Sequence, residues 1–492
     1  MQENERMKFD FSQPAPQAQT LEEAQQLINT LWSCVAELQA KVADLEEKLN
    51  TNSKNSSKAP STDLFKAKKQ KIKQHGAGKS KALKQGAQPG HTGKGRKLMP
   101  PESVDHTLIC LPETTCDCGG RVAANPNKMK RHQQFELPVI KPIVTEYQLV
   151  YGRCCDCGKT HCAPLPHGVS NTLLGVRAMA TAAIFTGDYR LSKSSTQQLF
   201  ADVFALPVSL GTISNAEKIV SAALQQPVEE LKVYIQQKPV VHADETSHKQ
   251  QGNKMWMWLA TTLLVAVFII RTRRSTQAAK DLLGEAFAGI LISDRYASYN
   301  WIKTICRQFC WAHLNRDMQK ISERSGQAGK IGDDILEYSR RMFRLWHRLK
   351  AGEIKRRTFK RAMIPIRNNI ERLLTEGTTC GHTKTENTCK NILKHKAALW
   401  TFVDVEGVEP TNNLAEQQIR FYVLWRKSSF GTQSERGNVF VERMMTTTAT
   451  CKLQGRNRYD FITTAVAAYV KNEPVPSLLP VKLESDCERL AA

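Results

Sequence analysis

Apolar residues near the start of the chain recur at alternating steps of three and four, the a/d spacing of a coiled coil over four heptads. The positions are Leu21, Ala24, Ile28, Leu31, Val35, Leu38, Val42, Leu45 and Leu49. The pattern predicts a coiled-coil helix over 21–50 and a homo-oligomer formed through it. The alternative is an amphipathic helix that packs on its own chain.

Two further stretches have patterns of their own. Alternating apolar residues at 135–144 and 146–151 predict strands. Residues 173–235 have the pattern of helices, and within them Thr196–Phe204, Ala205–Ser209 and Leu210–Val220 have the lengths of a helix-turn-helix, with Pro207 at the turn. That motif is compatible with DNA readout or with plain core packing.

The pattern changes again after Pro239. Residues 240–246 form an apolar strand that runs into Asp244, and the 16-residue apolar run 255–270 suits two buried strands, being short for a membrane span. A helix near 277–287 and a strand at 289–294, ending in Asp294, follow. The sequence therefore predicts a mixed α/β region whose sheet carries carboxylates at two strand ends.

The composition indicates the class of molecule that the protein binds. The 492 residues include 70 Lys and Arg against 47 Asp and Glu, a net charge of +23, which points to a polyanion such as nucleic acid. Almost half of the excess lies between Leu64 and Lys97, in a linker arm over 51–100 that lacks acidic residues after Leu64. We expect this arm, including Lys66, Lys68, Lys69, Lys71 and Lys73, to neutralise DNA phosphates without reading sequence.

The 14 cysteines are expected to be reduced, because no export signal precedes them. Two pairs, Cys116 with Cys118 and Cys154 with Cys157, are each followed by a glycine that permits a tight turn. Four such thiolates favour a structural Zn²⁺ in a zinc-ribbon domain over 105–168. Alternative ligands are Cys110, Cys155, His161 and Cys162, and unmetallated cysteines are the remaining interpretation.

Two neighbouring acids repel unless a cation lies between them, so Asp244 and Asp294 suit Mg²⁺. The best third oxygen ligand is Glu416, in the first turns of a helix that starts near Asn412. Beyond it, Arg420, Arg426 and Lys427 interleave with Trp425 and Phe430, which suits either a DNA strand or a packed helix. Cys310 and His313, with Cys306 one turn earlier, suit either a second metal site or core packing.

Several segments together resemble the transposases of the insertion sequence 66 family. They are the linker at 49–63, Gln88-Pro-Gly-His-Thr-Gly93, His242-Ala-Asp-Glu-Thr246, Ser293-Asp-Arg-Tyr-Ala-Ser-Tyr299, Cys310-Trp-Ala-His313 and Glu409-Pro-Thr-Asn-Asn413. The resemblance covers most of the chain. The sequence departs from the family pattern at Gln417, where Arg usually follows the glutamate. It also has one residue between Cys116 and Cys118 in place of the usual two.

The resemblance implies a ribonuclease-H-like catalytic domain over 238–450, with a helical insertion at about 326–395 and a C-terminal region over 451–492. It also implies an Asp-Asp-Glu triad of Asp244, Asp294 and Glu416 that holds two Mg²⁺ or Mn²⁺ ions. Water attack would free 3′-hydroxyls at the element's ends, and these would attack target DNA in the same site.

The expected partners are double-stranded DNA at the element ends and target, a second copy of the chain, and accessory proteins of the same element. We expect a bacterial cytoplasmic protein, associated with the nucleoid when bound, and no membrane partner. One alternative is a transposase-derived DNA-binding regulator without catalysis. Another is a general ribonuclease-H-like nuclease, which would cut DNA without joining it.

Overall fold

The computed structural model describes residues 18–52, 55–56, 98–125 and 128–480. The arm lysines from Lys66 to Lys73 lie outside the described residues. The chain divides into two compact units, one of residues 1–70, 146–198 and 208–492, and one of residues 71–145 and 199–207. No helix of the described residues is long and apolar enough to cross a membrane.

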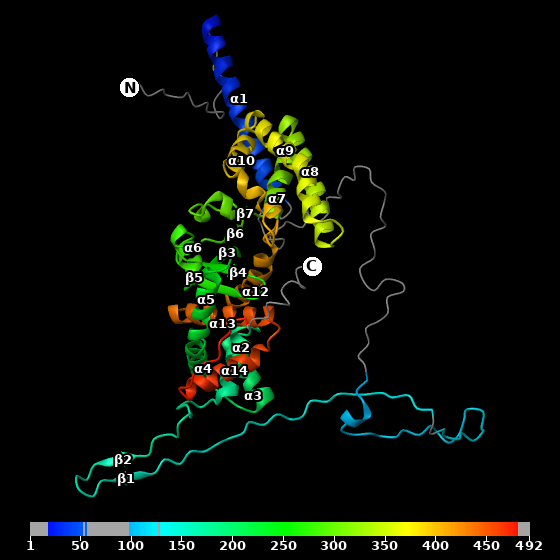
Figure 1. The fold of residues 1–492 in the computed structure, drawn as a ribbon, viewed down its shortest axis with the longest axis vertical. Helices are drawn as coiled ribbons and strands as arrows, with labels where there is room; N and C mark the ends of the chain where they lie inside the picture. The colour runs from blue at the N-terminus through cyan, green and yellow to red at the C-terminus, as the bar shows by residue number, and fades with distance from the viewer. Residues whose placement is uncertain (1–17, 53–54, 57–97, 126–127, 481–492) are drawn as a thin grey trace. The chain divides into compact units, whose positions relative to one another are not determined.

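Figure 1 labels most of the helices and strands of the described residues. The strands are β1 (Tyr151–Arg153), β2 (Thr160–Cys162), β3 (Val240–Gln250), β4 (Asn253–Thr261), β5 (Ala266–Arg271), β6 (Ile290–Ser293) and β7 (Arg307–Phe309). The α-helices are α1 (Leu21–Leu49), α2 (Val176–Gly187), α3 (Lys193–Phe204), α4 (Leu210–Ala223), α5 (Gln225–Gln236), α6 (Thr276–Leu283), α7 (Trp311–Ser322), α8 (Gly326–Lys350), α9 (Arg356–Glu376), α10 (Thr383–Lys394), α11 (Thr401–Asp404), α12 (Asn413–Ser429), α13 (Glu435–Leu453) and α14 (Arg458–Val470).

A mixed five-stranded sheet of order β5-β4-β3-β6-β7 forms the centre of the larger unit. Strands β5, β4 and β3 pair antiparallel, whereas β6 and β7 continue the sheet in parallel. The apolar run 255–270 forms most of β4 and β5, so the prediction of two buried strands is confirmed. Strand β7 was not predicted, because it is three residues long and two of them, Arg307 and Gln308, are buried polar side chains.

The prediction that both aspartates end their strands is half wrong. Asp294 directly follows β6, but Asp244 lies inside β3, which continues to Gln250. The cause is that β3 has two different neighbours. Its parallel pairing with β6 ends at His242, whereas its antiparallel pairing with β4 runs on to the tight turn between Gln250 and Asn253.

Helices cover the sheet and its outer edge. Helix α13 packs along β5, and its Thr446 and Thr450 hydroxyl oxygens accept hydrogen bonds from the backbone N–H groups of Phe268 (3.0 Å) and Ala266 (3.1 Å). These bonds satisfy donors that an edge strand would otherwise expose. Because α13 ends at Leu453, the expected boundary at 450/451 falls inside this helix.

Residues 173–235 form four helices, as the pattern predicted. Helix α4 starts after Ser209, whose side chain caps it, and the left-handed Ala205 (φ 49°) precedes it in the turn. One face of α4 is buried, and the helix packs against α2, α13 and α14. Core packing is therefore one role of this helix, and DNA readout stays a prediction.

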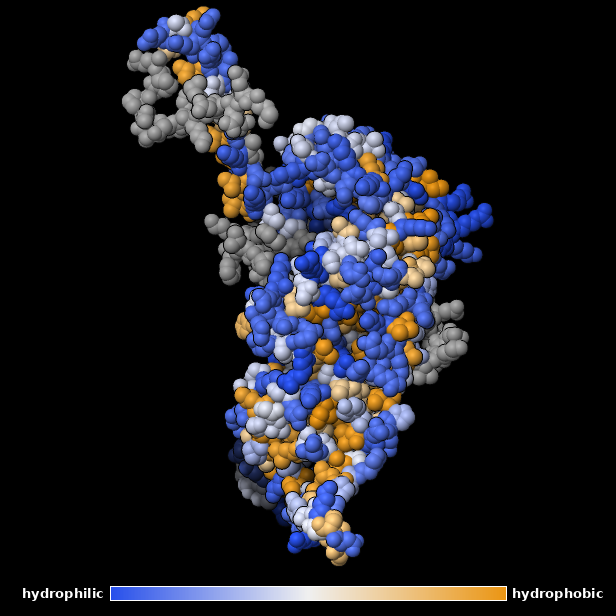
Figure 2. Space-filling model, turned by 90° about the vertical axis from the view of Figure 1, so that its left-hand side faces the viewer, coloured by the Kyte–Doolittle hydropathy of each residue, from blue (hydrophilic) through white to orange (hydrophobic). Residues whose placement is uncertain are grey.

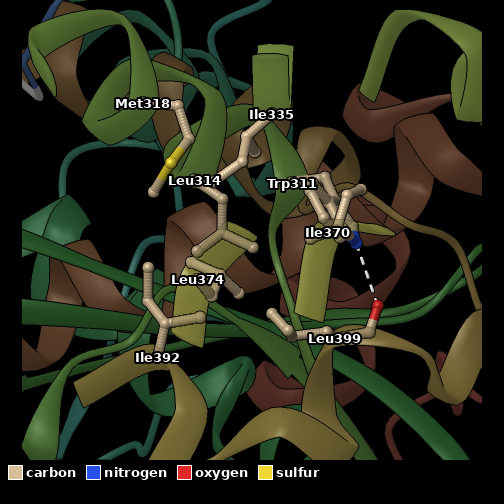
Figure 3. A pocket seen from close by; sticks show the side chains of 8 residues that line it. All are labelled: Trp311, Leu314, Met318, Ile335, Ile370, Leu374, Ile392 and Leu399. Atoms are coloured by element: carbon tan, nitrogen blue, oxygen red, sulfur yellow. Dashed lines mark hydrogen bonds between the residues drawn. The ribbon is translucent and has the colours of Figure 1, made fainter. Parts of the chain in front are cut away.

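The predicted insertion is helical. Helices α8, α9 and α10 occupy it and enclose an apolar core. Trp311, Leu314, Ile370 and their neighbours surround a void of about 10 Å³ (Figure 3). The void is lined by apolar side chains, so it offers a water no hydrogen-bond partners and carries no ligand site.

Helix α1 forms as predicted, but its partner is not within the described chain. All its seam residues except Ala24 are exposed, among them Ile28 (57%) and Leu45 (57%), and Figure 2 shows apolar side chains along its surface. Among the described residues, the ion pairs that join α1 to other elements lie in its last turns. Glu47 forms ion pairs with Lys320 (3.2 Å), Arg324 (2.9 Å) and Lys384 (2.6 Å) on α7, the turn that follows it, and α10.

Each cysteine pair lies at a tight turn. The backbone N–H of Gly119 donates to the carbonyl of Cys116 (2.7 Å), and that of Gly158 donates to the carbonyl of Cys154 (3.0 Å). Both glycines have positive φ, which explains why a glycine follows each pair. Hydrogen bonds from backbone groups, from Gly120 to Cys118 and from Cys157 to Cys154, lower the pKa of each thiol.

The strands expected at 135–144 and 146–151 are wrong apart from Tyr151, which starts β1. Pro138 and Pro142 remove two backbone donors from the first stretch, and a strand interior needs those donors. Most of its alternating apolar residues are exposed, as Val139 (86%) and Ile143 (97%) illustrate, so the described residues do not bury this stretch as one face of a sheet. Alternation alone did not indicate a buried face here.

Candidate active site

The two aspartates are brought together by the register of the parallel strands. Val240 pairs with Ile290 and His242 with Ile292, an offset of 50 residues. Asp244 and Asp294 also differ by 50, so they occupy matching positions just beyond the last pair. The β6–β7 register, in which Leu291 pairs with Arg307, places Cys310 next in the same row. The carboxyl ends of the parallel strands therefore deliver these groups to one edge.

Helix α12 brings Glu416 to the same edge. Asn412, immediately before this helix, is buried and bonded to both sides of the site. Its amide Nδ2 donates to the carbonyl of Ala243 (2.8 Å), its Oδ1 lies 3.1 Å from His242 Nδ1, and its backbone N–H donates to Cys310 Sγ (3.1 Å). The start of α12 is thus fixed against β3 and α7.

The electrostatics show that the acids converge. Burial raises the pKa of Asp244 well above its usual value, and the charges of Glu245, Asp294 and Glu416 raise it further. Side chains of Asp294 and Glu416 are 27% and 34% exposed, so solvent reaches them. Clustered carboxylates repel one another when all of them are ionised, and a cation bound between them removes this repulsion.

A fourth acid, Glu245, was not predicted as part of this site. Its side chain is 1% exposed, pairs with Arg274, and accepts a hydrogen bond from the Tyr299 hydroxyl (2.6 Å). Burial and the charge of Asp294 raise its pKa to about 7, against the opposing effects of Arg274 and Tyr299. Arg274 also lies 3.9 Å from Asp294 and stacks on Tyr296, at 3.5 Å from the ring centre.

The pairing of Arg274 with Glu245 gives a stability prediction. We expect Arg274→Met to lower the free energy of unfolding by roughly 3 kcal/mol, because a buried carboxylate loses its counter-charge. The value is at the low end for a buried pair, since Arg274 is 30% exposed. Adding Glu245→Gln should recover most of the loss. Urea unfolding in EDTA measures the free energy of unfolding of the single and the double variant. An equal decrease in both variants would assign the effect to the packing of Arg274 on Tyr296.

Cys310, His313 and Glu416 form a second group at the same edge. One ligand atom from each lies within 4.8 Å of the others, whereas Cys306 is not part of the group. His313 Nδ1 lies 3.5 Å from Glu416 Oε1, and within the described chain both buried atoms lack a hydrogen-bond partner. The sequence left a metal or a packing role open for this pair, and the geometry is compatible with a metal.

The basic residues of α12 differ in what they contact. Arg426 donates hydrogen bonds to the side chains of Thr246 (3.1 Å) and Ser247 (2.7 Å) on β3. Trp425 is buried and donates to the Thr186 carbonyl (2.9 Å). Arg420 and Lys427 are exposed. The packed interpretation therefore describes part of this stretch, and DNA contact by Arg420 and Lys427 stays a prediction.

The carboxylates of the site fit a hard divalent cation. Asp244, Asp294 and Glu416 offer oxygen atoms, the ligands that Mg²⁺ and Mn²⁺ prefer. A buried Glu416 oxygen that lacks a hydrogen bond among the described residues and the raised pKa of Asp244 are both features that a bound cation would relieve.

Comparison with known proteins gives the family of the chain. The model of the IS66 family of transposases matches residues 175–439. The chain belongs to this family. Residues 13–97 match a family of unknown function (DUF6444). Curated relatives of this IS66-family protein include two uncharacterized proteins of Sinorhizobium fredii (strain NBRC 101917 / NGR234), y4qI and y4hP.

The relatives are distant. The protein y4qI is 24% identical over 281 residues, which are 50% of this chain and 51% of y4qI. The protein y4hP is 23% identical over 399 residues, which are 73% of this chain and 71% of y4hP. The chain thus spans about half the length of the first of these relatives, and both names leave the activity open.

Proposed function

We propose that this IS66-family protein cleaves DNA at the ends of an insertion sequence and joins the freed 3′-hydroxyls to target DNA. The observation that carries the proposal is the offset of 50 residues between β3 and β6 in the mixed sheet, which is also the spacing of Asp244 and Asp294. Glu416 completes the triad from α12.

In this mechanism the chain positions the acids. The backbone N–H of Glu245 holds Asp244 Oδ1 (2.9 Å), and that of Tyr296 holds Asp294 Oδ1 (2.9 Å), so each carboxylate keeps a second oxygen for a ligand. Divalent cations held by the triad would activate the attacking oxygen and stabilise the leaving oxygen at phosphorus. Arg274 and Arg316 lie near these acids and balance part of their charge.

The remaining parts of the chain have supporting roles in the proposal. The arm lysines neutralise phosphates of double-stranded DNA, and Arg420 and Lys427 contact the strand near Glu416. Helix α1 pairs with its copy in a second protomer. Zinc binding by the four cysteines stays a prediction from the sequence.

The test uses the full chain with Mg²⁺ or Mn²⁺ and duplexes that carry the element's ends. We expect cut ends and, with a second duplex present, joined products. Cutting without joining would assign the protein to the general nucleases. Binding without cutting would assign it to the DNA-binding regulators.

A further inference from the structure

Positive charge is concentrated where α8 turns into α9. The 22 residues from Arg340 to Arg361, here called the basic hairpin, include ten Lys or Arg and one acid, Glu353. Across the whole chain, 70 of 492 residues are Lys or Arg. The hairpin therefore has about three times the average density of cations and a single acid among its own residues.

These cations lie on the outer faces of both helices. Met342 and Trp346 on α8, and Phe359 and Met363 on α9, are buried and face the core. Exposed cations spaced four residues apart lie on the opposite faces, namely Arg340, Arg344 and Arg348 on α8 and Arg357 and Arg361 on α9. Nine of the ten are exposed, namely Arg340, Arg341, Arg344, Arg348, Lys350, Lys355, Arg357, Lys360 and Arg361.

Half of the cations have no acidic or carbonyl partner among the described residues. Arg341 pairs with Glu337, Arg348 pairs with Glu353 (3.0 Å), and three others are bound to the segment discussed next. The unpaired five are Arg340, Arg344, Lys355, Arg357 and Arg361. These neighbouring like charges repel one another. A polyanion that binds there is attracted to the cations and also reduces their mutual repulsion.

The hairpin is firmly attached to the segment that leads to the catalytic helix. Arg356 donates to the carbonyls of Phe402 (2.7 Å) and Val405 (2.6 Å), and Lys360 donates to that of Asp404 (3.1 Å). Lys350 pairs with Glu409 (3.1 Å), three residues before Asn412. A ligand on the hairpin would therefore be held in a fixed position relative to Glu416.

We propose that the basic hairpin binds the phosphate backbone of double-stranded DNA and holds the duplex while its strand reacts at the triad. This proposal rests on the proposed function. The charge favours DNA over an acidic protein because protein interfaces need a buried apolar anchor. Between 340 and 364 the described surface offers one large exposed apolar side chain, Ile364.

The experiment compares two triple variants of the full chain with the same change in charge. Arg344→Glu, Arg357→Glu and Arg361→Glu remove three unpaired hairpin cations. Lys303→Glu, Lys330→Glu and Lys394→Glu form the control, since these lysines are exposed and lie outside the hairpin. Fluorescence anisotropy with a 30-base-pair duplex of arbitrary sequence measures affinity between 50 and 200 mM salt (roughly the range over which phosphate contacts change affinity most).

We expect the hairpin variant to lower affinity at low salt by roughly tenfold or more and to reduce the slope of log K against log salt by about 3. The control should change the slope by less than about 1. A hairpin variant that keeps the wild-type slope, or a control that loses as much, would overturn the proposal alone. Failure of the wild-type chain to bind any duplex would overturn the proposed function as well.

A loss of folding must be separated from a loss of binding. Thermal unfolding of the hairpin variant should match wild type, because the three arginines are exposed and form no ion pair or hydrogen bond with the part of the chain that the structure describes. If the glutamate variant unfolds, the same three residues replaced by glutamine give the second measurement. The slope should still fall by about 3, and an unchanged slope would again overturn the proposal.

Discussion

Asp244→Asn, Asp294→Asn and Glu416→Gln should each reduce DNA cleavage by roughly 10³-fold or more, equivalent to about 4 kcal/mol of transition-state stabilisation. Each change replaces an anionic oxygen ligand with a neutral amide of the same shape. The reduction is expected in Mg²⁺ and in Mn²⁺, measured as cut ends from end-bearing duplexes. Binding to the same duplexes should stay at the wild-type level, because the basic arm and the helices of the insertion are untouched.

The matched control is Asp281→Asn. Asp281 is also partly exposed and pairs with an arginine, Arg271 (2.8 Å), but it lies on α6 and outside the triad. It should keep full cleavage. Asp244→Asn should also unfold no more easily than wild type in EDTA, because it removes a carboxylate whose charge is repelled by three others. Full cleavage by any triad variant would remove that residue from the triad.

Much of the sheet could be predicted because its signals are local. The apolar run 255–270 is long and uniform, and a short apolar strand leads directly into Asp294. The chemistry of neighbouring acids linked Asp294 to Asp244 and suggested Glu416, and the resemblance to the IS66 family implied that the three form a triad. What the pattern could not supply was the register. Only the paired strands reveal that the spacing of 50 residues is the offset of the ladder itself.

The residues that contact the acids and hold them in place could not be predicted, for a physical reason. Arg274, Glu245 and Tyr299 are 29 and 54 residues apart, and such long-range pairing leaves no periodic trace in the sequence. The basic hairpin is different. Its cations can be counted in the sequence. The inference of a binding surface, however, needs to know which faces of α8 and α9 are buried and how Lys350 and Arg356 contact the segment before α12.

Self-association through α1 should be lost in Leu31→Asp with Leu38→Asp. Both residues lie on the seam, are exposed (43% and 54%), and would be buried by a second copy of the helix. Burying one leucine contributes about 1.5–3 kcal/mol, and a pair of helices would lose four such contacts. The association constant should therefore fall by at least roughly 10⁴-fold. Sedimentation equilibrium of the full chain measures it.

The control for the seam variant is Gln26→Asp with Ser33→Asp, which adds the same charge on the side of α1 opposite the seam. It should associate as wild type does. A monomeric wild-type chain, or equal association of both variants, would contradict pairing through α1. Because the ion pairs of Glu47 fix the end of this helix to α7 and α10, two paired helices would bring two catalytic units together. Cleavage that needs two DNA ends should then be lost in the seam variant and kept in the control.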